Sequence, residues 1–328
     1  MGDVAMTVPV LRALLEKYPS LKITILTKKF FAPFFRSLAN VSVYEADIKN
    51  KHKGVFGLYK LSRELKKLDI DFIADLHNVL RSNILKFFFF GKRFSQIDKG
   101  RKEKKQLVSG QTFHQLKTTH QRYVDVFDKL GFSVDLSNPM FEPKAELSSE
   151  LKSLIGFSSD KKLVGIAPFA AHEGKMYDLA QMKIVIQELA KKHTIILFGG
   201  GKKETEILNT IEAKYTNVVS IAGKISLEEE LDIISNLDTM LSMDSGNAHI
   251  AAMFGVKVIT IWNVTHPYAG FYPFAQPEEY ALLANRKEFP KIPTSIYGNK
   301  YPEGYQKAAS KTIIPEMIIS KILMTFED

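Results

Sequence analysis

Residues 243–255 read MDSGNAHIAAMFG and lie between two apolar, β-rich runs, 239–242 and 256–262. The two runs predict buried strands, and the small residues between them predict a helix. The same alternation continues along the chain, which predicts an α/β fold with parallel sheets covered by helices on both faces. The expected strands cover residues 21–27, 41–45, 71–76, 93–97, 163–167, 194–198, 218–221, 239–242 and 256–262. The expected helices cover residues 8–17, 55–67, 79–88, 120–130, 179–191, 203–213, 227–236, 248–254 and 313–326.

The turn that opens the helix after residue 243 is a candidate binding site. Asp244, Ser245 and Gly246 follow the carboxyl end of a predicted strand, which is the edge where open α/β sheets bind ligands. The first amides of a helix have no partner within the helix and attract anions, so the turn predicts a cradle for a diphosphate. Asp244 also suits a helix cap that needs no ligand. His249, on the first turn of this helix, is either a donor to the same anion or a packed core residue.

Length and composition set the broad class of the protein. The chain has 328 residues, enough for about two domains, and its 45% apolar and 25% charged residues are ordinary for a soluble protein. It contains no cysteine, which excludes disulfides and thiolate metal sites and fits a cytoplasmic location. We expect no signal peptide, because the amino terminus lacks a basic segment leading into an apolar core.

The net charge of +9 predicts an anionic partner. Part of the excess is local, since residues 86–105 hold eight basic and two acidic side chains. Two interpretations remain open for this segment, a solvated flexible loop or a patch for a phosphorylated lipid head group or an anionic membrane surface. Nucleic acid is not an expected partner, because aromatic and basic residues do not alternate as a stacking platform requires.

Four segments carry a more specific signal. They are Gly2-Asp3-Val4 with Thr7-Val8-Pro9, Asp75-Leu76-His77 with Arg81-Ser82, Pro168 to Lys175, and Asp244 to His249. In this order they resemble family 9 glycosyltransferases, the bacterial lipopolysaccharide heptosyltransferase group. The resemblance implies a GT-B fold, in which two Rossmann-like domains face a central cleft. It also implies inverting transfer from a nucleotide-sugar without a metal or another cofactor.

The expected domain boundary lies in a polar stretch, residues 138–160, where the periodicity weakens. Residues 1–150 are then an acceptor-side domain and residues 151–312 a donor-binding domain. The resemblance further implies that the last helix, within residues 313–328, packs back on the first domain.

The resemblance also assigns donor residues. Lys175 would contact phosphate or ribose, Glu204 would hold the ribose, and the backbone of Lys224 and Ile225 would contact adenine. The amides after Asp244 would hold the diphosphate.

Two departures from the family pattern leave the donor open. Ala170 and Ala171 stand where hydroxyl residues are common, and Tyr177-Asp178 replaces the usual Trp-Pro. The expected donor is ADP-heptose, and the alternative is a UDP- or GDP-hexose on the same fold.

Asp3 is the candidate general base, because glycosyl transfer needs a carboxylate near the acceptor hydroxyl. A helix cap is its alternative role. Gly2-Asp3 resembles a strand-to-helix loop, and the strand expected before it, central in the first sheet, is missing from this sequence. Either the natural start lies upstream of Met1 or this form is a catalytically impaired nucleotide-binding homologue.

We expect Arg36, Arg81, Arg101 and Lys102 on the acceptor side. The expected acceptor is a lipid-linked saccharide, and the expected location is the cytoplasmic face of the inner membrane, with the protein bound peripherally. A Rossmann dehydrogenase is not expected, because the chain lacks the Gly-x-Gly-x-x-Gly turn.

Overall fold

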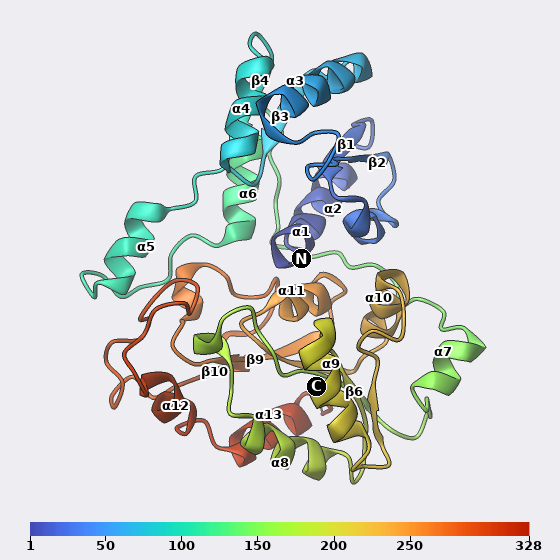
Figure 1. Cartoon of the computed structure of the whole chain (residues 1–328), viewed down its shortest axis with the longest axis vertical. Coiled ribbons are helices and arrows are strands. Elements are labelled where there is room, and N and C mark those ends of the chain that lie inside the picture. Colours follow the sequence, from blue (N-terminus) through green and yellow to red (C-terminus); the bar gives the residue numbers. More distant parts are fainter. Residues whose placement is uncertain (328) are drawn as a thin grey trace. The chain divides into compact units, whose positions relative to one another are not determined.

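The chain is described here over residues 1–327 by a computed structural model. It is an α/β protein that divides into two compact units (Figure 1). Unit 1 consists of Met1, Asp3–Arg101 and Lys117–Met140, and unit 2 consists of Gly2, Lys102–Leu116 and residues 141–327. Residues 102–116, although they lie in the first half of the sequence, therefore belong to unit 2.

The core of unit 2 is a six-stranded parallel sheet with the strand order β10-β9-β8-β5-β6-β7. Every residue of β5 and β8 is buried, as expected for central strands of a sheet covered on both faces. Because all pairs are parallel, the carboxyl ends of these strands meet at one edge. The strands are β5 (Leu163–Ala167), β6 (Thr194–Leu197), β7 (Val218–Ser220), β8 (Thr239–Met243), β9 (Lys257–Trp262) and β10 (Ala281–Leu283).

Helices cover this sheet and connect its strands. They are α5 (Arg101–Val108), α7 (Ser149–Leu154), η3 (Glu173–Lys175), α8 (Leu179–Leu189), α9 (Gly201–Glu212), α10 (Leu227–Ser235), α11 (Gly246–Met253), η4 (Pro267–Ala269), η5 (Glu278–Tyr280), α12 (Tyr305–Ser310) and α13 (Pro315–Met324).

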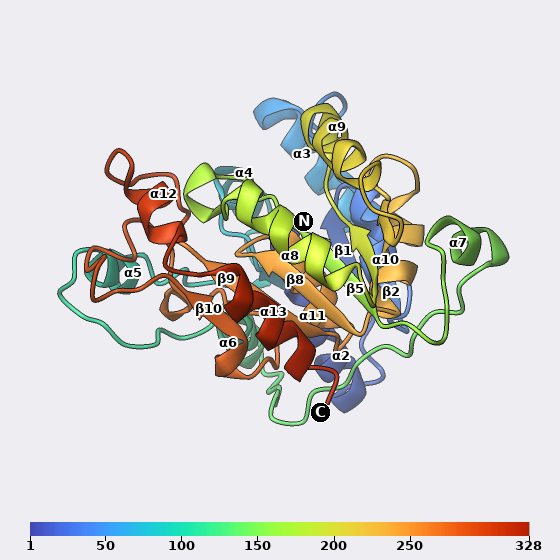
Figure 2. The same ribbon diagram turned by 90° about the horizontal axis from the view of Figure 1, so that it is seen from below.

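The last helix belongs to unit 2, which corrects the expectation that it packs on the first domain. Figures 1 and 2 show α13 beside α8, and the two helices are in contact. Ile318 and Ile322 are fully buried in the core of unit 2. Two further bonds hold the end of the helix, one between the hydroxyls of Thr239 and Thr325 and one from Lys257 Nζ to the Thr325 carbonyl at 2.7 Å. The buried side of α13, which carries Ile318 and Ile322, thus packs within unit 2.

Unit 1 contains two separate parallel strand pairs, β1–β2 and β3–β4, and not the single sheet expected from the sequence. Its elements are α1 (Gly2–Ala5), α2 (Thr7–Lys17), β1 (Ile23–Thr27), η1 (Lys29–Phe35), β2 (Val41–Glu45), α3 (Gly54–Leu65), η2 (Lys66–Leu68), β3 (Phe72–Asp75), α4 (Leu80–Phe88), β4 (Arg93–Gln96) and α6 (Thr119–Asp128). Residues 2–5 form a short helix, α1, and not the expected loop, because the amides of Val4 and Ala5 bond to the Met1 carbonyl.

All nine expected strands and all nine expected helices are present in the described chain, with bounds within about two residues for most. The α-helices and the strand that periodicity did not indicate are short or polar: α1, α5, α7, α12 and β10; the 3-10 helices η1, η3, η4 and η5 were not indicated either. A helix of one or two turns offers too few positions for an amphipathic repeat to emerge.

Candidate functional site

The donor-side candidates follow four strands that are neighbours in the sheet. The segments that follow β8, β5, β6 and β7 carry, in that spatial order, Asp244, Lys175, Glu204 in the first turn of α9, and the Lys224–Ile225 pair. Three strand spacings separate the first strand from the last, about 14 Å in all. This row of loops is long enough for an extended nucleoside diphosphate to lie along the sheet edge.

Lys175 and Asp244 form an ion pair at this edge. Lys175 Nζ lies 2.8 Å from Asp244 Oδ2, and the two side chains are only 13% and 4% exposed. Lys175 ends η3, which follows β5, and Asp244 directly follows β8, so the pairing of β5 with β8 brings the two together. Two opposite charges this deeply buried depend on each other, since removing either one leaves an uncompensated charge.

The amino terminus of α11 lies beside this pair, with Gly2 against Gly246 and His249. Ser245 is the N-cap residue, but its side chain accepts no hydrogen bond from the helix. Its hydroxyl instead pairs with that of Ser242, with 2.9 Å between the oxygens. Asp244 makes no cap either, so the helix-cap interpretation of this residue is wrong. Among residues 1–327 the first amides of α11 have no side-chain acceptor, and this is the arrangement that binds phosphate groups.

His249 completes this group from the first turn of α11. Its side chain is 8% exposed. Burial, with the nearby positive charge of Lys175, lowers the pKa of His249 to about 3, so the ring is neutral at physiological pH. Its Nδ1 is buried and has no hydrogen-bond partner among residues 1–327. A neutral imidazole offers one donor and one acceptor, so His249 has a free polar atom in the site.

The loop that carries Lys175 is held from several sides. The amide of Val264 donates to the Gly174 carbonyl at 3.2 Å. The side-chain amides of Asn263 and Gln306 both donate to the Met176 carbonyl at 2.9 Å. Neither Asn263 nor Gln306 was predicted from the sequence, although Asn263 directly follows a predicted strand.

Tyr177 and Asp178, which depart from the family pattern, have structural roles. Tyr177 is buried and its hydroxyl donates to the Ile313 carbonyl at 2.6 Å, which joins the Lys175 loop to the segment before α13. Asp178 is the N-cap of α8 and accepts a hydrogen bond from the Gln181 amide at 3.0 Å. This difference from the usual Trp-Pro therefore concerns packing and capping in this chain.

Glu204 and Lys224 already have partners at the sheet edge. Glu204 Oε2 accepts a hydrogen bond from the Gly200 amide at 2.8 Å, directly before α9. Lys224 Nζ bonds both oxygens of Glu212 at 2.9 and 3.0 Å. The Lys224 side chain is thus engaged at the surface, and its backbone is the part expected to meet a ligand. Ile225, half-buried, follows it in the same loop.

The unit 1 candidates lie on separate elements. Asp3 is exposed on α1, and its backbone carbonyl accepts a hydrogen bond from the buried Tyr123 hydroxyl at 3.3 Å. Arg36 directly follows η1, and Arg81 is exposed in the first turn of α4. Arg101 opens α5, and the neighbouring Lys102 belongs to unit 2.

Asp75 organises the corner between β3 and α4. Its Oδ1 accepts hydrogen bonds from the amides of His77 and Asn78, both at 2.9 Å, and its Oδ2 accepts one from Gln96 at 2.7 Å. Burial alone would raise the pKa of Asp75, but these bonds, with that of Gln96 foremost, hold it below its ordinary value. Asp75 therefore has a structural role at this corner.

The basic segment is ordered in part as helix α5. Lys104 is buried with its Nζ 4.0 Å from the centroid of the Phe271 ring, and Leu107 is buried beside Leu116 and Ala269. Arg101, Lys102 and Lys105 are exposed. The interpretation of this segment as a solvated flexible loop is therefore wrong for α5, which has an apolar side packed in unit 2.

The described part of the chain has neither a metal-site cluster nor a membrane-spanning helix. Within residues 1–327 no group of three or more acidic, histidine or cysteine side chains has the arrangement of a metal site. None of the helices in that range combines the length and the apolarity needed to span a bilayer.

Comparison with known proteins finds similarity to heptosyltransferases. The sequence profile of glycosyltransferase family 9 (heptosyltransferase) matches residues 58–294, which is more than half of the chain. The lipopolysaccharide core heptosyltransferase OpsX of Haemophilus influenzae is 28% identical over 336 aligned residues, which cover 99% of this chain and 90% of that protein. The lipooligosaccharide heptosyltransferase 2 of Campylobacter jejuni is 23% identical over 271 residues, which cover 81% of this chain and 79% of that protein.

Solved structures confirm the fold. The family 9 glycosyl transferase of Veillonella parvula matches 100% of this chain and 95% of its own, with a TM-score of 0.77 and 18% identity. The E. coli heptosyltransferase WaaC with ADP matches 99% of this chain and 96% of its own, with a TM-score of 0.68 and 16% identity. The expected GT-B fold class is thus confirmed, and, with the profile match, it places the chain in glycosyltransferase family 9, the heptosyltransferase family.

Proposed function

We propose that this protein is an inverting heptosyltransferase, which moves heptose from ADP-heptose onto a lipopolysaccharide-core or related cell-surface glycan. Family membership supports the reaction class, and the names of the relatives supply the donor and the acceptor. The observation that carries the proposal within this chain is the Lys175–Asp244 pair beside the uncapped amino terminus of α11.

Lys175 and α11 would stabilise the leaving group. As the glycosidic bond to the donor breaks, negative charge accumulates on the departing diphosphate. The Lys175 ammonium and the amides of Ser245 and Gly246, aided by the helix dipole, are suited to meet this charge. Asp244 would hold Lys175 in place, and the neutral His249 would contribute one further hydrogen bond. Metal-independent transfer is part of this proposal, with the Lys175 cation as the counter-charge.

The remainder of the donor would extend along the sheet edge. Glu204 would bind the ribose and the backbone of Lys224 and Ile225 would meet the adenine, in the order in which β6 and β7 follow β5. Glu204 would then exchange or share its present bond to the Gly200 amide. The segment of Lys224 and Ile225 would determine whether the donor is ADP-heptose or a UDP- or GDP-hexose, because it would contact the base and not the diphosphate.

Asp3 would act as the general base toward the acceptor hydroxyl, and Arg36, Arg81, Arg101 and Lys102 would bind the anionic groups of a lipid-linked acceptor. We further propose a peripheral location at the cytoplasmic face of the inner membrane, where such an acceptor is reached. The basic character of the chain supports this part of the proposal.

The first experiment is calorimetric titration of the protein with ADP, UDP and GDP. We expect selective ADP binding, weakened about 10- to 100-fold in Lys175→Met, because a charge-assisted phosphate contact contributes about 1.5–3 kcal/mol. Lys162→Met is the matched control, since Lys162 pairs with Asp238 at 3.1 Å at the opposite end of β5. Equal ADP affinity of the Lys175 variant and the wild type would refute the assigned site.

Turnover with ADP-heptose and a lipopolysaccharide acceptor is the second readout. Asp3→Asn should lower kcat about 100-fold or more with ADP affinity unchanged, as expected for the loss of a general base. EDTA should leave the rate unchanged. Preference for UDP or GDP would indicate a UDP- or GDP-hexose as the donor. ADP binding without transfer would favour a catalytically impaired homologue, as suggested by Ala170 and Ala171.

A further inference from the structure

Three phenylalanines of unit 1 are almost completely exposed to solvent. Phe56 on α3 is 92% exposed, Phe87 on α4 is 79% exposed, and Phe90 in the following turn is 98% exposed. Single exposed apolar residues are ordinary, but a group of large ones on adjoining elements indicates an interaction surface.

These side chains belong to one continuous surface. Helices α3 and α4 pack against each other. The rings of Tyr59 and Phe88 meet across them with centroids 5.4 Å apart, and Phe88 meets Phe87 at 5.9 Å. Phe56 lies one helical turn from Tyr59, and Phe90 follows Phe87 by three residues. We call this surface the α3–α4 face; it consists of Val55, Phe56, Tyr59, Lys60, Leu80, Lys86, Phe87, Phe90 and Lys92.

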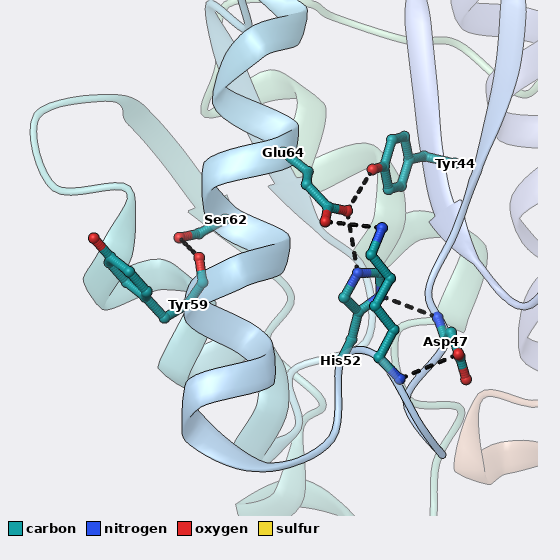
Figure 3. A network of polar contacts seen from close by, with 7 residues as sticks. Tyr44, Asp47, His52, Tyr59, Ser62 and Glu64 are labelled. Atoms are coloured by element: carbon teal, nitrogen blue, oxygen red, sulfur yellow. Dashed lines mark hydrogen bonds and ion pairs between the residues drawn. The ribbon is translucent and has the colours of Figure 1, made fainter.

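The exposed residues of α3 are separate from the residues by which this helix packs in the core of unit 1. The opposite side of the helix already packs in the unit through Leu58, Leu61 and Leu65, which cluster with Phe89. Figure 3 shows Tyr59 and Glu64 on different sides of α3. Folding of unit 1 therefore uses one apolar stripe of α3 and leaves a second one outside.

A polar network fixes the orientation of α3. Glu64 accepts hydrogen bonds from Tyr44 at 2.7 Å and pairs with His52 at 3.1 Å and Lys51 at 2.8 Å (Figure 3). These partners come from β2 and from the loop before α3. The helix is thus held at its polar side while Phe56 faces solvent, so the exposed stripe is presented on a fixed element.

The surroundings of these aromatics are strongly basic. Residues 49–93 contain eleven Lys and Arg against four Asp and Glu, a local excess of seven in a chain whose net charge is +9. Lys60, Lys86 and Lys92 are exposed close in sequence to the three phenylalanines. Aromatic rings among lysines favour the boundary of an anionic bilayer, where the rings enter the acyl region and the lysines reach the phosphates.

We propose that the α3–α4 face is the membrane-docking surface of this protein and that its occupant is an anionic phospholipid bilayer. This assignment rests on the proposed function, in which the acceptor is lipid-linked. Within the basic segment of residues 86–105 it assigns the membrane contact to Lys86 and Lys92 and not to α5, whose apolar side is packed on unit 2.

The test is flotation of the full chain with phosphatidylcholine vesicles that contain or lack phosphatidylglycerol. Wild type should bind the anionic vesicles and not the neutral ones. The variant Phe56→Ser/Phe87→Ser/Phe90→Ser should lose at least about tenfold in affinity, equivalent to about 1.4 kcal/mol. Lys60→Glu/Lys86→Glu should lose more than about 25-fold, because each lysine near an anionic surface contributes about fivefold and each glutamate adds repulsion.

The matched control is Phe157→Ser/Ile184→Ser/Met317→Ser, which removes three apolar side chains of unit 2 that are 45%, 51% and 45% exposed. It should bind the vesicles as the wild type does. Circular dichroism confirms that each variant is folded. Unchanged vesicle binding by the phenylalanine variant would overturn the proposal. So would wild-type self-association that the variant abolishes without any vesicle binding, because the occupant would then be a second copy.

ADP titration of the same variants separates the two proposals. The α3–α4 variants should bind ADP as the wild type does, because none of their residues lies in unit 2. Vesicle binding without ADP binding would refute the donor site and leave the docking surface standing. ADP binding without vesicle binding would refute the docking surface alone.

Discussion

Single residues in this protein depend on strand pairing for their chemistry. Lys175 and Asp244 are 69 positions apart in sequence, yet the parallel pairing of β5 with β8 places their charged atoms 2.8 Å apart. The sequence indicated both residues separately, from their places after predicted strands and from the family resemblance. It did not indicate that they meet, because strand order is a non-local property.

Glu64 gives a prediction at this scale. Its bonds to Lys51, then to Tyr44 and His52, lower the pKa of the Glu64 carboxyl from 4.5 to about 2. A carboxyl with a depressed pKa stabilises the folded state above its unfolded pKa and loses that contribution as the pH falls. We therefore expect Glu64→Gln to lower the melting temperature at neutral pH, and the difference from wild type to vanish between pH 4.5 and about 2.

The control for Glu64 is Glu188→Gln. Glu188 pairs with Lys191 at the surface, with side chains 50% and 59% exposed, and exposed pairs contribute little. Thermal melts of the three proteins across this pH range provide the measurement. A Glu64→Gln difference that stays constant with pH would contradict the assigned cause.

At the scale of elements, the short helix η3 shows how a loop becomes part of a site. Its position is set by Gly174, where a Cβ atom would overlap the carbonyl oxygen of Gly298 and crowd the ring of Tyr301. The glycine thus permits a close approach of two backbones that a sequence pattern does not reveal. Lys175 follows directly, so the placement of its ammonium depends on this contact.

Gly174→Ala tests that dependence. The added methyl must displace η3 or the segment at Gly298, and Lys175 moves with η3. We expect ADP affinity to fall about tenfold or more, the loss of one charge-assisted contact, while circular dichroism shows a folded protein. Wild-type ADP affinity in this variant would show that the Lys175 loop tolerates displacement.

At the scale of the whole molecule, the chain does not divide at one point. Residues 102–116 join unit 2, where the Leu116 amide donates to the Tyr268 carbonyl at 3.0 Å and Arg286 lies 3.4 Å from the centroid of the Phe113 ring. The helix α13 also belongs to unit 2. Both assignments follow from apolar side chains that find their packing partners far along the sequence.

Ile318→Ala tests the place of α13. Ile318 is fully buried in the core of unit 2, and truncation of such a side chain costs about 2–5 kcal/mol. The only tryptophan of the chain, Trp262, is buried in β9, so its fluorescence reports the unfolding of unit 2. We expect this transition to shift to lower denaturant concentration, with little change in Met317→Ala, whose side chain is 45% exposed. An unshifted transition would show that α13 does not stabilise unit 2.

The sequence by itself determined the α/β class, the approximate bounds of nine strands and nine helices, and the chemical types gathered at strand ends. These properties are local, since periodicity and turn residues act within about ten positions. Only the tertiary structure decided the strand order, the pairing of Lys175 with Asp244, the supporting bonds of Asn263 and Gln306, the place of α13, and the outward position of Phe56, Phe87 and Phe90. Each of these depends on which surfaces meet when the chain packs, and a run of phenylalanines in sequence looks the same whether it faces a core or the solvent.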